Sequence, residues 1–460
     1  MKSIQLVTAI IPIFYFNFMI QMMSNSTHQI QSNSTHYPAF PSLFIHAAIL
    51  LAFFAGINVG SHIAYVVGND LPLGKGYHTF IQIHGHLQLM GWAGLFIMGV
   101  SLYFLPRLTH IEIKPLKKST WILWLMVSGL LLRFICHSLI PYIDDSPWYS
   151  PISLLVVLSG TLVFLSILLY LTILIQIIKK SFRKKITDNR KIALFVLLTM
   201  LGWLIYALGN QVLLIIMIFN HEIALMHNWN YFLIDLFIHF SIFSICMAVG
   251  IRTLPLFMRL PVIKWNVEKF AWTFATLLFI IFGGKILYHF VYHSSIAYII
   301  YISSLLKDFL MIWFILKINI LFRTRPPWTT GMKKERIPHR KEPRKNLPDY
   351  GEFGRFEWLI KPAFFWLLIG LLFDIIIQFS LLTKRITEIS ADGVRHIYLL
   401  GFISLLIIGM AVRMIPGMTG IRKLTRPKWV APLAIIVNIA VFLRVFTLVL
   451  PTQFISAFPG

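Results

Sequence analysis

The sequence predicts an all-α fold, a polytopic transmembrane bundle of 11–12 helices. Of its 460 residues, 58% are hydrophobic and only 13% are charged. The mean hydropathy is +0.77, which lies outside the range of soluble globular domains. Uncharged apolar runs recur along almost the whole chain, and about 20 such residues suffice to cross the hydrocarbon core of a bilayer. One bundle in the lipid bilayer is therefore expected, and not a set of soluble domains.

Charge and cysteine content exclude several classes of protein. The formal net charge is +24, but the Lys and Arg residues sit in short linkers between apolar runs and form no basic domain with interleaved aromatic residues. We therefore expect no nucleic-acid partner. The two cysteines, Cys136 and Cys246, both lie within apolar runs, and no Cys-x-x-Cys motif occurs. Disulfide scaffolds, thiolate clusters and covalent haem attachment are excluded on that ground.

Twelve apolar runs bounded by charged or turn residues give the expected helices. Their expected bounds are 3–22, 42–66, 79–105, 119–140, 152–178, 192–219, 230–257, 268–292, 295–321, 356–383, 392–416 and 429–450.

The charges of the linkers orient the bundle, because Lys and Arg favour the cytoplasmic side of a membrane. Five linkers are basic, and they alternate with linkers that are acidic, mixed or short. The basic linkers are 114–118, 179–191, 259–264, 323–355 and 422–428. This alternation predicts eleven spans from residue 42 onward and an extracytoplasmic C-terminus.

The chain accordingly divides into an N-terminal apolar segment with a polar linker, 1–41, and the transmembrane bundle, 42–460, which carries a basic cytoplasmic loop at 323–355. The first apolar run, 3–22, resembles a signal peptide or signal anchor because Lys2 precedes it and a polar stretch follows it. Either would leave residue 37 outside, whereas the later charges require it inside. Whether this run spans the membrane or is cleaved stays open.

Two of the expected helices repeat one pattern. His86, Gly91, Gly99 and Pro106 have the same spacings as His396, Gly401, Gly409 and Pro416. Each histidine opens its helix on the outer side, the glycines allow close approach of a neighbouring helix, and each proline is expected to end the helix. A weaker third copy runs from Asp235 to Pro255, with His239 one turn deeper.

Histidines gather in the outer half of the expected bundle. They are His62, His78, His84, His86, His137, His221, His227, His239, His289, His293 and His396. Ionisable groups inside a membrane are costly and usually have a partner. A neutral imidazole is a ligand for iron or copper and brings no charge into the low-dielectric interior.

Position within the helices selects the candidate ligands. His86 and His396, on equivalent helices, are the expected axial ligands of a non-covalent b-type haem. His84 is a weaker candidate because, two residues from His86, it faces the other side of the helix. For a second metal, possibly copper, the expected ligands are His239, His289 and His293; the spacing of the last two predicts one helical face. The histidines near helix ends, and His137, are expected to be structural.

Two segments resemble the NnrS family. One runs from His84-Gly-His-Leu-Gln-Leu-Met-Gly to Leu105-Pro-Arg, and the other from Arg395-His-Ile-Tyr-Leu-Leu-Gly to Arg413-Met-Ile-Pro-Gly-Met-Thr-Gly. The resemblance covers mainly two helices. It implies a multi-pass protein of the bacterial inner membrane that contains haem and copper and is linked to the response to nitric oxide.

A wider likeness concerns subunit I of haem–copper oxidases and nitric oxide reductases. Without the first apolar run, His84 and His86, His239, His289 and His293, and His396 fall on helices two, six, seven and ten, which carry the metal ligands there. The tenth helix has one histidine where an oxidase has two, and Phe243 stands in the place of the redox tyrosine. A two-haem oxygen-reducing enzyme is therefore disfavoured.

The sequence thus predicts a haem-binding membrane protein of the nitric oxide or nitrosative stress response, with copper as a second candidate metal. The alternative is a divergent membrane oxidoreductase that reduces nitric oxide or oxygen and takes electrons from a redox partner or quinol. A transporter or scaffold without metal is the third hypothesis.

Overall fold

The computed structural model describes residues 41–109, 111, 116–183, 187–258, 260–261, 263–322, 353–387, 389–421 and 424–449. Over these residues the fold is all-α, without a β-strand. Eleven helical stretches are long and apolar enough to cross a membrane, from Ser42–Gly68 to Pro427–Phe446. The expected eleven spans from residue 42 are therefore confirmed. The apolar run 3–22 and almost all of the basic loop 323–355 lie outside the described residues.

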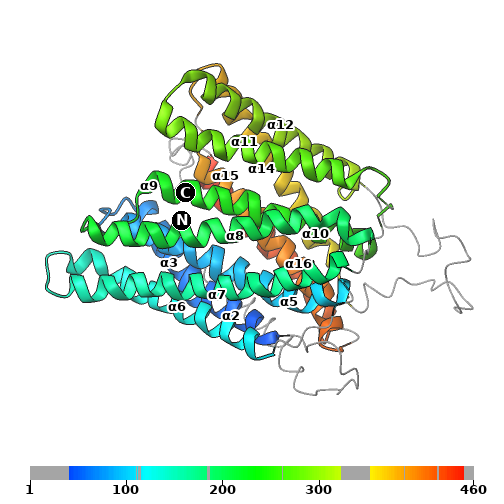
Figure 1. The fold of residues 1–460 in the computed structure, drawn as a ribbon, viewed down its shortest axis with the longest axis horizontal. Coiled ribbons are helices and arrows are strands. Elements are labelled where there is room, and N and C mark those ends of the chain that lie inside the picture. The colour runs from blue at the N-terminus through cyan, green and yellow to red at the C-terminus, as the bar shows by residue number, and fades with distance from the viewer. Residues whose placement is uncertain are drawn as a thin grey trace, which may run out of the picture. The chain divides into compact units, whose positions relative to one another are not determined.

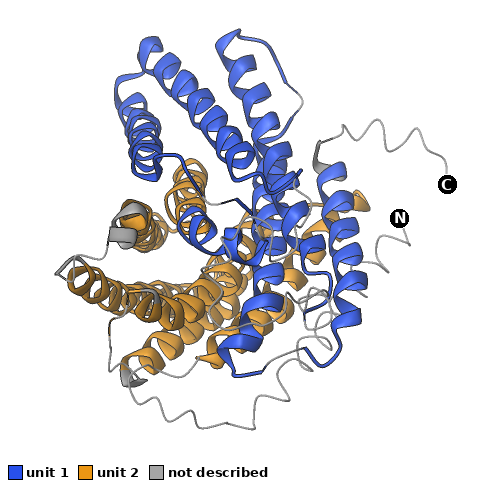
Figure 2. Cartoon of the chain, turned by 90° about the vertical axis from the view of Figure 1, so that its right-hand side faces the viewer, with its two compact units in different colours: residues 1–31, 247–460 blue, residues 32–246 orange. Residues whose placement is uncertain are grey.

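The chain divides into two compact units, shown in separate colours in Figure 2. Unit 2 comprises Ser32–Cys246, and unit 1 comprises Met247–Gly460 together with Met1–Gln31.

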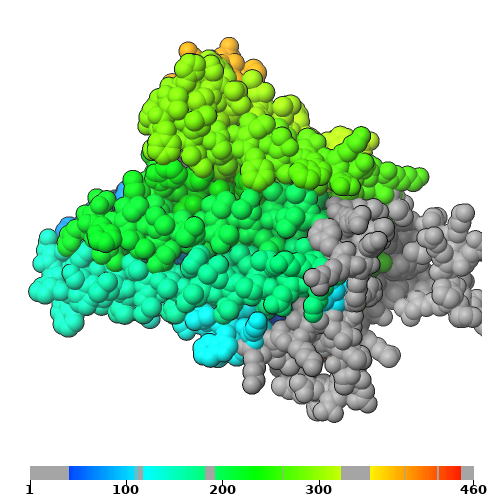
Figure 3. All heavy atoms as spheres, in the orientation of Figure 1, coloured from blue at the N-terminus to red at the C-terminus, as the bar shows by residue number. Residues whose placement is uncertain are grey.

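Unit 2 holds the first spans. Its elements are α2 (Ser42–Leu51), η2 (Ala52–Ile57), α3 (Asn58–Gly68), α4 (Tyr77–His86), η3 (Leu87–Gly94), α5 (Leu95–Leu108), α6 (Leu116–Ile143), α7 (Tyr149–Arg183), α8 (Thr187–Phe219), α9 (His227–Leu236), η4 (Phe237–Phe243) and the start of α10 (Ser244–Phe257). The long helices α6, α7 and α8 lie side by side (Figure 1). In the space-filling view α7 and α8, cyan to green, pack against each other along their length (Figure 3).

Unit 1 holds the remaining spans. Its elements are α11 (Val267–Val291), α12 (Ser294–Ile318), α14 (Glu357–Leu382), α15 (Ala391–His396), η6 (Ile397–Ser404), α16 (Leu405–Met418), η7 (Pro427–Trp429) and α17 (Val430–Val449). Within this unit α12 packs against both α11 and α14, and α14 packs against η6 and α16.

The three spans of the internal repeat share one order of elements, which also occurs in α2–η2–α3 and is therefore not specific to the repeat. In each, an α-helix leads into a π-helical segment and then into a second α-helix: α4–η3–α5, α9–η4–α10 and α15–η6–α16. The π-segments η3 and η6 both have 8 residues and begin directly after His86 and His396, while His239 lies inside η4. Segments of π-helix are rare in proteins overall, and those that do occur often lie at functional sites.

The three spans also end alike. Each proline lies two residues before the last helical residue, so the helix continues briefly past the residue that was expected to end it. The proline carbonyl then accepts a hydrogen bond from the backbone N–H five residues later, at 2.9 Å for Pro106, 3.0 Å for Pro255 and 2.7 Å for Pro416. Proline lacks an N–H but keeps its carbonyl acceptor, so this hydrogen bond can form and closes a turn directly after each proline.

These three spans are the most buried of the eleven. Within the most apolar window of each, 78%, 72% and 72% is buried, against at most 50% in any other span. Two of the matched glycines stand at close helix contacts, as the sequence predicted. A Cβ atom at Gly99 would lie 2.7 Å from Cβ of Phe44, and one at Gly409 would lie 2.7 Å from Cγ1 of Ile360. Each repeated span is therefore largely buried over its most apolar part.

Candidate functional site

His86, the last residue of α4, is buried against α8. It is 5% exposed, and its Nδ1 lies 2.9 Å from the hydroxyl of Tyr206 on α8. The two rings are nearly parallel, with 14° between their planes. Tyr206 is itself 2% exposed. Over the described residues Nε2 of His86 has no hydrogen-bond partner, so one ring nitrogen is held and the other is available to a ligand.

Two further ionisable side chains on α6 face the same region. Arg133 and His137 are one helical turn apart and therefore share a face of the helix. Arg133 is 1% exposed and His137 is fully buried. None of the three guanidinium nitrogens of Arg133 has a hydrogen-bond partner over the described residues, and neither has Nδ1 of His137. Both interact electrostatically with His86, which places the three groups in one cluster.

Arg133, His86, His137 and Tyr206 form what we call the arginine–histidine cluster. Its charge is unbalanced, because a guanidinium stays protonated in proteins and the electrostatic neighbours of Arg133 are the tyrosine and the two histidines. No carboxylate of the described residues pairs with it. Trp203, three residues before Tyr206 on α8, adds a fully buried indole N–H without an acceptor in the described part of the chain.

The connection between α8 and α9, residues 220–226, is bound to the helices that carry this cluster. Gln82 of α4 exchanges two hydrogen bonds of 2.8 Å with the backbone N–H and carbonyl of Leu225. The Ile223 carbonyl accepts a hydrogen bond from Nε2 of His137 at 3.2 Å and one from Thr79 at 2.9 Å. The connection therefore fixes Nε2–H of His137, which in the neutral ring leaves the lone pair on Nδ1.

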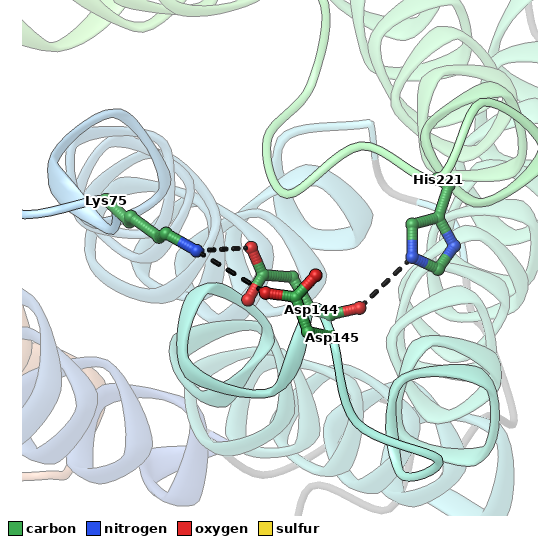
Figure 4. Close-up of polar contacts among 4 residues, drawn as sticks. All are labelled: Lys75, Asp144, Asp145 and His221. Carbon is green, nitrogen blue, oxygen red and sulfur yellow. Dashed lines mark hydrogen bonds and ion pairs between the residues drawn. The ribbon is translucent and has the colours of Figure 1, made fainter.

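Outside the spans, polar contacts join the same connection to two other turns (Figure 4). Nζ of Lys75 lies 3.0 Å from Asp144 and 3.8 Å from Asp145, and Nε2 of His221 donates to the Asp144 carbonyl at 3.1 Å. The hydrogen bond with Asp144 raises the pKa of Lys75 above its ordinary value, and the same bond lowers the pKa of Asp144. Both groups are solvent-exposed, so this ion pair adds little stability.

His84 faces away from the arginine–histidine cluster, as its spacing from His86 predicted. Its Nδ1 donates to the carbonyl of Gly56 in η2 at 2.8 Å. A Cβ atom at Gly60 of α3 would lie 2.5 Å from Cε1 of His84, so only glycine leaves room for this ring. His84 and His86 therefore contact different neighbouring helices.

His239 and His396 are held in the same manner. Nδ1 of His239 donates to the carbonyl of Asp235, and Nδ1 of His396 donates to the carbonyl of Asp392, both at 2.8 Å. A carbonyl only accepts, so Nδ1 carries the hydrogen and the lone pair of the neutral ring lies on Nε2. Both rings are half-buried. Histidines that bind metals typically donate their other N–H in this way.

The remaining two candidates are exposed and do not share a helical face. The helix α11 ends at Val291, and Tyr292 follows in the left-handed conformation, with φ of 51°. His293 then caps the N-terminus of α12, where its Nδ1 accepts a hydrogen bond from Ser295 at 3.3 Å. The expected continuous face of His289 and His293 is therefore not formed, because the chain reverses between them.

Unit 1 contains a second buried polar group that the sequence analysis did not single out. Nζ of Lys307 on α12 lies 2.8 Å from Asp308 and 3.7 Å from Asp374 on α14. The hydroxyl of Tyr398 in η6 donates to Asp374 at 2.8 Å. Three charged residues inside apolar helices were a visible signal, since such groups are rare in spans and mark functional or paired sites. We call these four residues the lysine–aspartate cluster.

Within the described part of each unit, no three His, Cys, Asp or Glu side chains are grouped to hold a metal ion. His86, His84 and His239 belong to unit 2, whereas His289, His293 and His396 belong to unit 1. The pairing of His86 with His396, and the grouping of His239 with His289 and His293, stay predictions.

Comparison with known proteins gives one finding. A search of curated proteins found no match. The family model described as NnrS protein matches residues 355–458, which contain α14 to α17 and His396. The likeness to oxidase subunit I stays a prediction. The chain is thus a polytopic membrane protein whose last three spans are similar to the NnrS family.

Proposed function

We propose that this chain is a haem-binding integral membrane protein that acts in the response to nitric oxide, with copper as a second candidate metal. The similarity of residues 355–458 to the NnrS family supports the link to nitric oxide. It also supports a location in the inner membrane of a bacterium, where the basic linkers favour an extracytoplasmic C-terminus.

The main observation in support of haem binding is the environment of His86. A histidine that binds haem iron is neutral, is surrounded by apolar side chains, and has its second nitrogen fixed by a hydrogen bond. His86 is 5% exposed, its Nδ1 is held by Tyr206, and its Nε2 has no hydrogen-bond partner over the described residues. The residues present therefore fit an iron ligand.

Other candidates take supporting roles in the proposal. His396 follows the same pattern at the equivalent position of the repeat, with Nδ1 held by a backbone carbonyl, and would be the second residue to hold the haem. His84 is the alternative to His86. His239 is the proposed ligand of a second metal. Bound haem would supply a redox-active iron, and Tyr206 would orient the imidazole of His86.

The test is the haem content of purified variants of the full-length chain. His86→Ala is expected to lose most of the Soret absorbance per protein, and His396→Ala to lose a similar share. His46→Ala is the matched control, because Nδ1 of His46 also donates to a backbone carbonyl of its own helix at 2.8 Å. A normal Soret band in both variants would refute the assignment of His86 and His396 as haem ligands. A colourless, metal-free protein from haem-replete cells would favour a transporter or scaffold.

A divergent oxidoreductase that takes electrons from a redox partner or quinol is the second candidate, and the lysine–aspartate cluster favours it. Reduction of nitric oxide or oxygen consumes protons, and intramembrane ionisable groups mark proton paths. Lys307 and Asp308 are almost wholly buried, and Asp374 is largely so. Consumption of nitric oxide or oxygen by the reduced, purified protein would support this function. A haem protein that binds nitric oxide without consuming it would exclude it.

A further inference from the structure

Arg133 carries a buried positive charge that the described part of the chain does not neutralise. Its side chain is 1% exposed, and its three nitrogens have no hydrogen-bond partner over the described residues. A charge removed from water without a partner costs several kcal/mol. A group that supplies the missing negative charge would recover that free energy.

Arg107 shows what a satisfied arginine looks like in the same unit. It lies near the end of α5, where its guanidinium stacks on the ring of Tyr103 at 3.6 Å and donates to the Tyr103 carbonyl at 3.0 Å. Arg133 has neither kind of contact with a described residue. An arginine in a span of this unit can therefore find partners within its own helix, as Arg107 does.

We propose that Arg133 binds a planar oxyanion inside unit 2. The fork of guanidinium N–H groups matches two coplanar oxygens of a carboxylate or a similar anion. The neighbouring groups are compatible with that charge, since they are two histidines and a tyrosine hydroxyl without a carboxylate.

The oxyanion has two possible sources with the same chemistry. One is the propionate of a haem bound by His86, and this source rests on the proposed function. The other is a free small anion, for which nitrite and acetate are suitable probes. Arg133 and His86 belong to the same cluster in either case, so the experiment has to separate the two sources.

The first arm measures haem binding to the full-length, haem-free chain in detergent. Haem and its dimethyl ester, which lacks the propionate charges, are titrated into wild type, Arg133→Gln and the control Arg107→Gln. If a propionate pairs with Arg133, wild type and Arg107→Gln bind the ester about 30-fold more weakly than haem, the loss expected when one partner of a buried charged pair is removed. Arg133→Gln then binds both compounds with equal affinity.

The second arm titrates nitrite and acetate into the same haem-free proteins by calorimetry. Saturable binding in wild type that is weakened at least about 10-fold in Arg133→Gln and kept in Arg107→Gln supports a free anion. If neither arm shows a difference that depends on Arg133, the proposal is overturned. A chain that binds no haem refutes the proposed function, and the second arm then decides the oxyanion site by itself.

A stability measurement separates binding from folding. Loss of an unpaired buried charge removes its desolvation cost, so Arg133→Gln is expected to raise the unfolding temperature of the anion-free, haem-free chain. Arg107→Gln is expected to leave it unchanged or lower it. A lower unfolding temperature for Arg133→Gln would show that Arg133 is already paired within the chain, which contradicts the proposal.

Discussion

Replacement of Lys307 by Met is expected to destabilise unit 1 more than loss of either carboxylate. The ammonium group is shared, because it lies 2.8 Å from Asp308 and 3.7 Å from Asp374. Coulomb energy falls inversely with distance, so the longer contact retains about three quarters of the attraction of the shorter one. Lys307→Met leaves two buried carboxylates facing each other, and removal of one partner of a buried pair costs about 3–5 kcal/mol.

Asp308→Asn leaves the Lys307–Asp374 pair in place and is expected to cost about 1.5–3 kcal/mol, the range for a hydrogen bond to a charged group. The assay is unfolding of the purified protein in a denaturing detergent, followed by circular dichroism. Lys317→Met is the control on the same helix, since Lys317 is exposed near its end and should change stability by less than about 0.5 kcal/mol. Equal or greater destabilisation by Asp308→Asn would refute the shared-ammonium argument.

Three further outcomes follow from contacts in unit 2. Tyr206→Phe removes the hydrogen bond that holds Nδ1 of His86, so haem affinity in a Soret titration should fall about 10–100-fold; unchanged affinity would contradict the proposed role of Tyr206. Gln82→Ala removes two hydrogen bonds to the α8–α9 connection and should cost about 1–3 kcal/mol, measured as faster amide hydrogen exchange in residues 220–226. The Lys75–Asp144 contact should add a small amount of stability at neutral pH. This stability is lost as the pH falls through the lowered pKa of Asp144, and also as the pH rises through the raised pKa of Lys75. In Lys75→Met the unfolding midpoint should therefore depend less on pH in both ranges.

The spans were predictable because their signal is averaged over many residues. Hydropathy and the alternation of basic linkers gave eleven spans from residue 42, and the helix expected over 79–105 occupies Tyr77–Leu108. Helix ends were less predictable: α7 continues to Arg183, because lysines and arginines form good helices beyond the membrane core. The π-segments carry no hydropathy signal of their own and were not predicted.

The site was less predictable, because its members come from different helices. His86 was chosen from the sequence since it lies inside an apolar helix, and its burial fits that choice. Arg133 and Tyr206 were missed because nothing in a sequence says which faces of α6 and α8 meet. That His137 lies in the arginine–histidine cluster was likewise not predicted. The reversal at Tyr292, which separates His289 from His293, requires a left-handed residue that is not glycine and therefore left no sequence signal.

The π-segments also bear on how the repeated spans can change over time. A π-turn closes its hydrogen bond one residue further along the chain than an α-turn, so each such turn accommodates an additional residue without altering the direction of the helices on either side. Loss of one residue within Leu87–Gly94 or Ile397–Ser404 would return the span to a regular α-helix with its flanking contacts intact, while the backbone next to His86 or His396 would be reshaped. Deletion of a single residue during evolution would therefore change the backbone next to one of these histidines and leave the flanking helices in place.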